Sequence, residues 1–274
     1  MLASLIIVFR EVLEAGLIVG IVLAATRTVP GRGRWIGGGI VAGTLGACVV
    51  AAFAGGIANA FAGAGQEILN AGILGLAVLM LAWHNIWMSS HARDLSAQMY
   101  AVGDAIAAGS RPMYALAVVV GLAVLREGSE VVLFLYSIAA AEGGGTRAMI
   151  AGSGIGIVVG AGVAGLLYFG LLGIPTRYLF RVTGWLITLL AAGMASQAVA
   201  FLGQAGLVPP LIDTVWDTSW LLSDATLFGK TLHTLIGYTD RPSAMQLIAY
   251  VGTLLAIYLM MRRFSEAPAR RATA

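Results

Sequence analysis

The stretch LASLIIVFREVLEAGLIVGIVLAA, residues 2–25, is apolar along its length except for one charged motif in its middle. An α-helix needs about 20 consecutive apolar residues to cross the hydrocarbon core of a bilayer. The motif, Arg10-Glu11-Val12-Leu13-Glu14, therefore falls inside a predicted transmembrane helix, with Glu11 roughly 15 Å from its start at about 1.5 Å per residue. These charges distinguish the stretch from a cleavable signal peptide, so we expect a retained helix.

Six further apolar stretches follow, and the sequence predicts an all-α integral membrane protein with seven transmembrane helices. Spans are expected near residues 2–25, 36–58, 67–89, 113–140, 148–172, 182–204 and 245–261. Only 11% of the 274 residues are charged and 59% are hydrophobic, whereas soluble domains carry about 25% charged residues. We therefore expect one transmembrane domain over 1–274, ending in a polar tail, 262–274, without regular structure.

Basic residues fall mainly in alternate loops. The predicted topology puts eleven of the 16 Lys and Arg residues on one side of the membrane and three on the other, with Arg10 and Arg126 inside spans. The positive-inside rule then predicts an extracytoplasmic N-terminus and a cytoplasmic C-terminus, which requires an odd number of spans. Because the net charge of +3 comes from these loops, it does not indicate a nucleic-acid partner.

The charged motif occurs twice, since Arg126-Glu127-Gly128-Ser129-Glu130 repeats the pattern 116 residues later. The apolar stretch after each motif has small residues at every fourth position, which lets membrane helices approach closely. These residues are Gly39, Gly43, Ala47, Ala51 and Gly55 in the first half and Gly152, Gly156, Gly160 and Ala164 in the second. We therefore predict two three-helix repeats, about 1–92 and 113–204. Three is an odd number, so the second repeat is inverted in the membrane. The outer loop 205–244 and the helix 245–261 follow the repeats.

Each motif concentrates charge at the predicted membrane centre. Residues i, i+3 and i+4 share a helix face, so both glutamates of a motif project together and the arginine reaches the second one. A charge at the midplane costs roughly 2.5–3.5 kcal/mol, and the four carboxylates exceed the two guanidiniums. A metal-cation site needs this excess, because carboxylate oxygens bind hard cations. Helix-packing ion pairs and a proton relay are the alternatives. The predicted metal ligands are Glu11, Glu14, Glu127 and Glu130, with Arg10 and Arg126 as their ion-pair partners.

Other polar residues are secondary candidates. Asp213 and Asp217 have the spacing of one helical turn in the outer loop and are candidates for concentrating cations at the entrance, although a solvated polar face is the favoured explanation. Gln197, in the sixth span, lines the path or makes an interhelical hydrogen bond. His84 lies toward the cytoplasmic end of the third span, where it either marks an exit or, as the favoured alternative, is an ordinary interfacial histidine. Asp224 is expected to be either a helix cap or a ligand.

With these twin motifs in its first and fourth predicted helices, the chain resembles the oxidase-dependent high-affinity iron permease family of fungi and bacteria. The family form is usually Arg-Glu-Gly-x-Glu, which the second motif fits, while Val12 replaces the glycine in the first. The resemblance extends through Ser196-Gln197-Ala198, Trp216-Asp217-Thr218-Ser219-Trp220-Leu221-Leu222 and Gly237-Tyr238.

The resemblance implies a multi-pass protein of the cytoplasmic membrane that takes up Fe(III). The Fe(III) is produced outside by a partner that oxidises Fe(II), and bacterial partners are periplasmic iron-binding or cupredoxin-like proteins. The motif glutamates are then iron ligands, iron is the transported substrate, and no cofactor is permanently bound.

Two other functions are compatible with the motifs themselves. One is a proton-coupled transporter of another divalent cation such as manganese. The other is an intramembrane di-metal carboxylate enzyme, which is less favoured because Glu-x-x-Glu lacks the histidines of the Glu-x-x-His di-iron motif. The sequence has no His-Glu-x-x-His or serine-nucleophile motif, so we expect a protein without enzymatic activity.

Overall fold

The computed structural model describes the backbone of residues 1–60, 66–142, 146–170, 176–209, 211–224 and 226–271. Over these ranges the chain is helical, without a strand. The helices are α1 (Leu2–Ala25), α2 (Arg32–Ala60), α3 (Gln66–Ala107), α4 (Tyr114–Glu142), α5 (Thr146–Tyr168), α6 (Thr176–Gln204), α7 (Leu227–Ile236) and α8 (Ala244–Arg271). The all-α architecture predicted from the apolar stretches is therefore confirmed for the described part of the chain.

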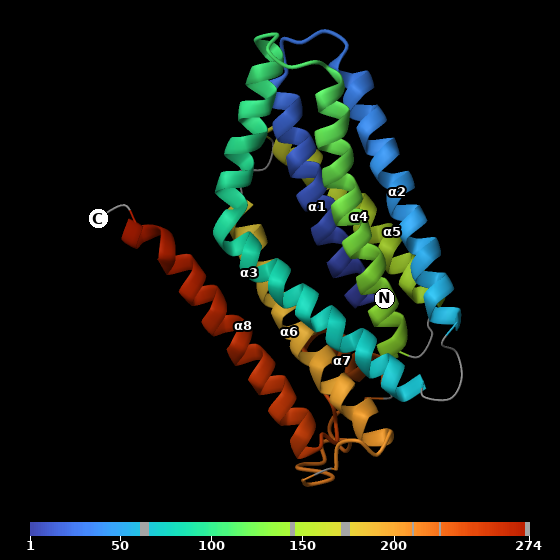
Figure 1. Cartoon of the computed structure of the whole chain (residues 1–274). Coiled ribbons are helices and arrows are strands. Elements are labelled where there is room, and N and C mark those ends of the chain that lie inside the picture. The colour runs from blue at the N-terminus through green and yellow to red at the C-terminus, as the bar shows by residue number, and fades with distance from the viewer. Residues whose placement is uncertain (61–65, 143–145, 171–175, 210, 225, 272–274) are drawn as a thin grey trace.

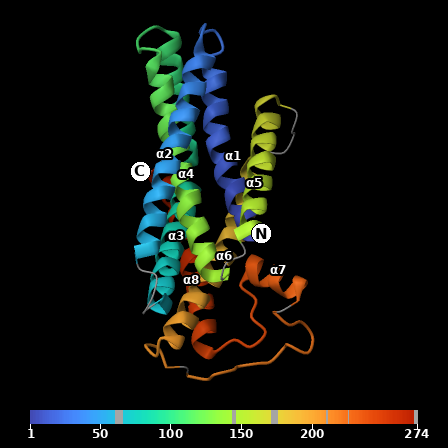
Figure 2. The same cartoon turned by 90° about the vertical axis from the view of Figure 1, so that its right-hand side faces the viewer.

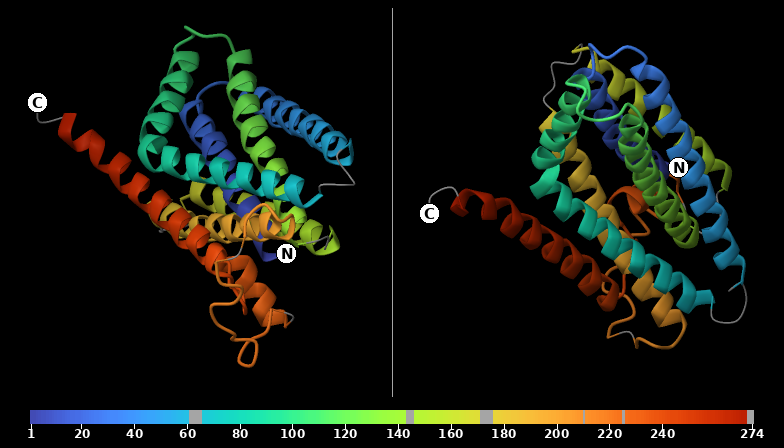
Figure 3. Two further views of the ribbon diagram at one scale, coloured as in Figure 1. Left: turned by 60° about the horizontal axis from the view of Figure 1, so that its bottom comes forward. Right: turned by 45° about the horizontal axis from the view of Figure 1, so that its top comes forward.

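The long helices form an elongated bundle (Figure 1). The connections after α1 and α3 lie at one end, and the segment with α7 lies at the other. Seen from the side, α2 runs along α4, and α5 runs along α1 (Figure 2). Helix α3 contacts α6, and α8 lies at one edge of the molecule against both (Figure 3). The second helix of each half thus packs on the motif helix of the other half.

The small residues predicted at every fourth position of α2 and α5, here called the small-residue ribbons, make these close contacts. A Cβ atom on Gly43 of α2 would lie 2.6 Å from the carbonyl oxygen of Gly121 in α4. A Cβ atom on Gly156 of α5 would lie 2.8 Å from the carbonyl oxygen of Leu5 in α1. Backbones that approach this closely leave no room for a larger side chain, so the ribbons set the distance between the helices of each pair.

Five of the described helices are long and apolar enough to cross a membrane: the spans run over Arg32–Ala54, Glu67–Trp87, Thr146–Tyr168, Phe180–Gln204 and Ala244–Arg263. The other two predicted spans correspond to α1 and α4. Each of these helices has a comparable length but carries the three charges of its motif. The chain is therefore a multi-pass helical membrane protein, and α1 and α4 each carry one charged motif.

Two helices are longer than the sequence predicted. The predicted span 67–89 agrees with the apolar segment Glu67–Trp87, but helix α3 continues beyond it to Ala107, where Ile106 packs in an apolar cluster with Val22 and Leu116. Helix α8 was expected near 245–261 with an irregular tail, but it continues to Arg271. The prediction of an irregular tail was therefore wrong as far as Arg271, and residues 272–274 lie outside the described part.

The outer loop is folded rather than extended. It contains the amphipathic helix α7, which begins after the N-cap Thr226 and ends at Gly237. Gly237 has a φ of +69°, and its Cα would lie 2.8 Å from a Cβ on Gly193 of α6, so both positions favour glycine. The Tyr238 hydroxyl lies 2.6 Å from the Thr218 hydroxyl and donates to the Leu222 carbonyl. The Gly237 contact therefore packs the loop against α6, and the Tyr238 contacts join parts of the loop to one another.

Candidate functional site

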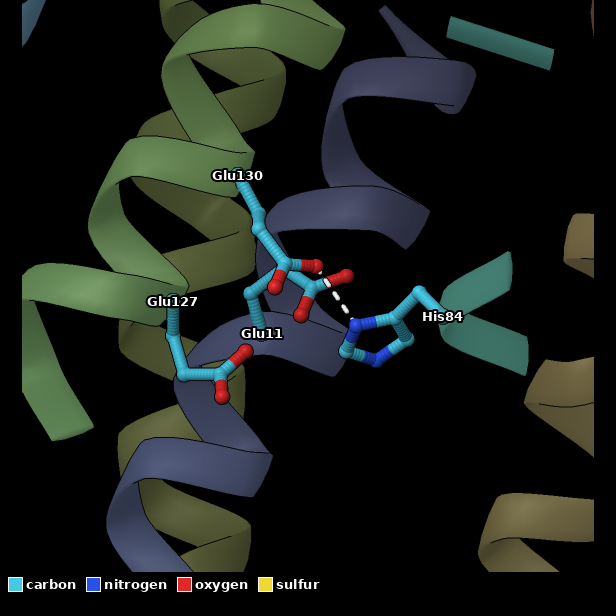
Figure 4. Close-up of side chains that lie close together, drawn as sticks. All are labelled: Glu11, His84, Glu127 and Glu130. Atoms are coloured by element: carbon cyan, nitrogen blue, oxygen red, sulfur yellow. Dashed lines mark ion pairs between the residues drawn. The ribbon is translucent and has the colours of Figure 1, made fainter. Parts of the chain in front are cut away.

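Four side chains from three helices meet in the interior of the bundle. Glu11 of α1, His84 of α3, and Glu127 and Glu130 of α4 each offer a ligand atom, and these atoms all lie within 4.8 Å of one another. Figure 4 shows the three carboxylates and the imidazole ring pointing toward a common space. Three of the four residues are buried, and Glu130 is partly buried. The structure therefore brings one glutamate of the first motif together with both glutamates of the second.

The first motif is sealed inside the protein. Arg10 Nε lies 2.8 Å from Glu14 Oε1, and both side chains are buried. Glu11 is fully buried, with Arg10 Nη1 at 3.8 Å from its Oε1. Among the described residues, no group donates a hydrogen bond to either oxygen of Glu11. Burying a carboxylate without a hydrogen-bond donor costs free energy. A cation bound at Glu11 would offset this cost, because neither oxygen is engaged elsewhere in the described part of the chain.

The second motif is more open than the first. Arg126 Nε lies 3.2 Å from Glu130 Oε1, but the Arg126 side chain is 42% exposed, against 3% for Arg10. The Arg126 guanidinium also stands 4.8 Å from the centre of the Trp87 ring, a cation–π distance. Arg126 nevertheless lies beside the cluster, since its Nε is also 3.8 Å from Glu127 Oε1.

His84 is the residue that sequence reasoning misjudged. It is buried inside the bundle, with 3% of its surface exposed, and is in contact with both motifs. Its Nδ1 lies 2.6 Å from Glu130 Oε2, and its Nε2 lies 3.2 Å from Glu14 Oε2. One imidazole therefore joins the two motifs. The available signal was its position within an apolar span, since an ionisable residue at membrane depth is rare and usually functional.

Helix α3 is held in register on α6 next to this histidine. The Asn85 side chain donates to the Gly184 carbonyl at 3.1 Å and to the Thr188 hydroxyl at 2.9 Å. On the other side of the cluster, Glu11 and Glu127 line a cavity of about 800 Å³ between α1, α2, α4 and α5, whose remaining wall is largely apolar. The cluster is thus fixed from one side and borders open space on the other.

The secondary candidates lie away from this cluster. Gln197 is half-buried on α6 and is not among the residues brought together. Asp213 and Asp217 lie in irregular chain rather than on one helical turn, so the spacing argument for them was wrong. Asp217 pairs with Arg241 at 3.0 Å. Hydrogen bonds from the Ser219 hydroxyl and amide hold the pKa of Asp217 below its ordinary value.

Asp224 is not a helix cap, because Thr226 has that role. Its carboxylate accepts a hydrogen bond from the Asp240 amide, and the Asp240 carboxylate accepts one from the Asp224 amide. Burial raises the pKa of Asp224 above its ordinary value. These hydrogen bonds join Asp224 to Asp240 within the outer loop. Both residues are far along the chain from the motif helices.

Ionisable side chains inside membrane helices are rare and usually mark a functional site, and here such side chains converge from three helices. Residues 1–264 match the iron permease FTR1 family, and the chain belongs to that family. It is therefore an iron permease-type transport protein rather than an enzyme.

Individual relatives agree with this assignment. The chain is 31% identical over 257 residues to the ferrous iron permease EfeU of Escherichia coli O6:H1, with 91% of each chain covered. It is 29% identical over 254 residues to the ferrous iron permease EfeU of Yersinia pestis, covering 91% of this chain and 89% of that protein. No solved structure matches the chain.

Proposed function

We propose that this protein moves iron across the cytoplasmic membrane through the carboxylate cluster of its two motifs. The observation that carries the proposal is the convergence of Glu11, Glu127 and Glu130 within 4.8 Å of one another and of His84. Such a set of buried acceptors is unfavourable without a cation. Glu14, the fourth glutamate predicted as a ligand, is held by Arg10 and His84 and acts beside the site.

The transported species in this proposal is Fe(III), supplied by a partner oxidase that acts on Fe(II) outside the membrane. Three carboxylates suit a hard, highly charged ion. The relatives' names specify ferrous iron, whereas in this proposal the permease carries the iron after its oxidation. Reconstituted vesicles containing the chain alone should then take up Fe(III) and should not take up Fe(II) kept reduced without oxygen. Uptake of reduced Fe(II) by the chain alone would overturn the Fe(III) step and the need for the oxidase.

The membrane topology in this proposal is seven spans, with the N-terminus outside and the C-terminus in the cytoplasm. The exchange of second helices between the halves, α2 on α4 and α5 on α1, is the packing expected of two inverted repeats. The outer loop then faces the partner protein. Reporter fusions in the connection 26–31 and in the outer loop test the orientation, and a cytoplasmic outer loop would exclude it.

Substitution of the glutamates tests the cluster as the iron path. Glutamine keeps the shape and polarity of glutamate but removes the charge, so Glu11→Gln or Glu127→Gln should sharply reduce iron uptake per folded molecule. Glu67→Gln is the matched control, because Glu67 is an exposed residue in the first turn of α3. Uptake of radioactive iron into vesicles, normalised to folded protein, is the measurement.

The outcome distinguishes a transport role of the glutamates from a packing role, and iron from other transported cations. Near-parental uptake in both variants would mean that these carboxylates are not the path. Loss of folded protein with normal uptake per molecule would assign them to packing. A second transport reading, proton-coupled uptake of manganese, predicts that manganese is carried in preference to iron in the same vesicles.

A further inference from the structure

The two motifs are nearly symmetric, but the site that they form is not. Helix α3 contributes His84 to the cluster, and α6, its counterpart in the second half, has no histidine in its sequence. The chain contains three histidines, of which His233 lies on α7 outside the bundle. The imidazole is therefore an addition that the repeated motif does not explain.

We propose that His84 is a direct ligand of the transported ion and that its nitrogen sets the selectivity of the site for iron over calcium and magnesium. This proposal rests on the proposed function, because it takes the same cluster to be the ion path. A site made only of carboxylates suits calcium, magnesium and manganese, whereas imidazole suits iron and other transition metals. One nitrogen donor therefore discriminates against the abundant alkaline-earth cations.

The geometry around the ring is that of a metal-ligating histidine. Such a histidine almost always donates its second ring N–H to a carboxylate, which orients the ring and fixes the tautomer. Here Nε2 lies 3.2 Å from Glu14 Oε2, and the other Glu14 oxygen is held by Arg10 Nε at 2.8 Å. When Nε2 carries the ring proton and donates it in a hydrogen bond to Glu14, Nδ1 is unprotonated. The lone pair of Nδ1 is then directed toward the remaining carboxylates.

The Nδ1 side of the ring carries the open acceptors. Nδ1 lies 2.6 Å from Glu130 Oε2, and the Glu11 and Glu127 carboxylates complete the group on that side. Both oxygens of Glu11 and one oxygen of Glu127 have no hydrogen-bond donor among the described residues. A cation placed there is bound by nitrogen and oxygen together. Arg10 and Glu14 then act as positioning residues behind His84, which explains why Glu14 does not join the four converging side chains.

Pulsed electron paramagnetic resonance of bound Mn²⁺ tests the ligand assignment in the purified full-length chain. The protein is prepared with a histidine-free affinity tag, and a directly bound imidazole gives a ¹⁴N coupling to the metal. His84→Gln should abolish this coupling, while His233→Gln should leave it unchanged. Glu14→Gln should weaken Mn²⁺ binding roughly 10–100-fold, as expected for an outer-shell carboxylate, but keep the coupling.

If His84→Gln does not fold, a second variant that leaves the site intact still tests the ligand assignment. The double variant His91→Gln, His233→Gln makes His84 the only histidine of the chain. Labelling its histidine with ¹⁵N should convert the ¹⁴N coupling into a ¹⁵N coupling. No coupling in this variant, or a coupling that survives His84→Gln, overturns the assignment.

Selectivity is measured in vesicles by competition. In His84→Gln, the calcium concentration that halves iron uptake should fall by about tenfold or more, in line with the loss of a metal-site contact. The His233→Gln vesicles should match the parent. Unchanged competition would overturn the selectivity role. Failure of the glutamate variants to affect uptake would instead overturn the proposed path, and it would leave the Mn²⁺ coupling of His84 as a separate result.

Discussion

Alanine substitutions in the small-residue ribbons test how closely the helix pairs are packed. In Gly43→Ala, the new Cβ would lie 2.6 Å from the Gly121 carbonyl oxygen and 2.8 Å from Val124 Cβ, both on α4. Optimal contacts between such atoms are about 3.5–4.0 Å. Because the first of these partners is backbone, α2 and α4 must move apart. Gly38→Ala, on the same helix, meets nothing within 4 Å and is the matched control.

The two substitutions differ only in this overlap. Replacing glycine by alanine inside a helix stabilises it by about 1 kcal/mol, and this gain applies to both variants. Overpacking costs about 1–3 kcal/mol and applies only to Gly43→Ala. We therefore expect Gly38→Ala to be as stable as the parent or more stable, and Gly43→Ala to be less stable than Gly38→Ala by about 1–3 kcal/mol.

Unfolding of the purified protein in mixed micelles by a titrated denaturing detergent, followed by tryptophan fluorescence, gives these free energies. The second ribbon provides an independent pair, because a Cβ on Gly156 would lie 2.8 Å from the Leu5 carbonyl oxygen while Gly162 has nothing within 4 Å. Gly156→Ala should therefore also be less stable than Gly162→Ala. Equal unfolding free energies within both pairs would refute the close packing of α2 on α4 and of α5 on α1.

Two further predictions concern charges. Arg10→Gln should cost about 3–5 kcal/mol, because it leaves Glu14 buried without its guanidinium. Arg126→Gln should cost less, because the Arg126 side chain is 42% exposed and Glu130 keeps His84 at 2.6 Å. Thermal unfolding compares the two, and equal losses contradict the asymmetry. In the outer loop, burial raises the pKa of Asp224 above 3.8. Its ionisation therefore destabilises the folded loop at neutral pH, and this penalty disappears as the pH falls below 3.8. Asp224→Asn should increase hydrogen-exchange protection of the loop at neutral pH but not in acid, and an equal gain at both contradicts the sign.

Local sequence was sufficient for the positions of most helices and for three of the four cluster residues, Glu11, Glu127 and Glu130. The apolar stretches near 36–58, 148–172 and 182–204 correspond to α2, α5 and α6, because hydropathy and length are properties of a single segment. The spacing of Glu127 and Glu130 likewise predicted that they share a helix face, and both lie in the cluster. The irregular tail and the helical turn at Asp213 and Asp217 were wrong, since neither stretch has a strong periodic pattern of its own.

The sequence by itself determined that two charged motifs lie inside apolar helices and that small residues line the helices that follow them. Only the tertiary structure decided which of those charges meet. His84 lies 70 residues from Glu14 along the chain yet at 3.2 Å in space. The side chain of Arg126, identical in motif to Arg10, is 42% exposed, whereas that of Arg10 is 3% exposed. The physical reason is that a motif specifies the face of its own helix, whereas burial and ligand geometry depend on which other helix covers that face.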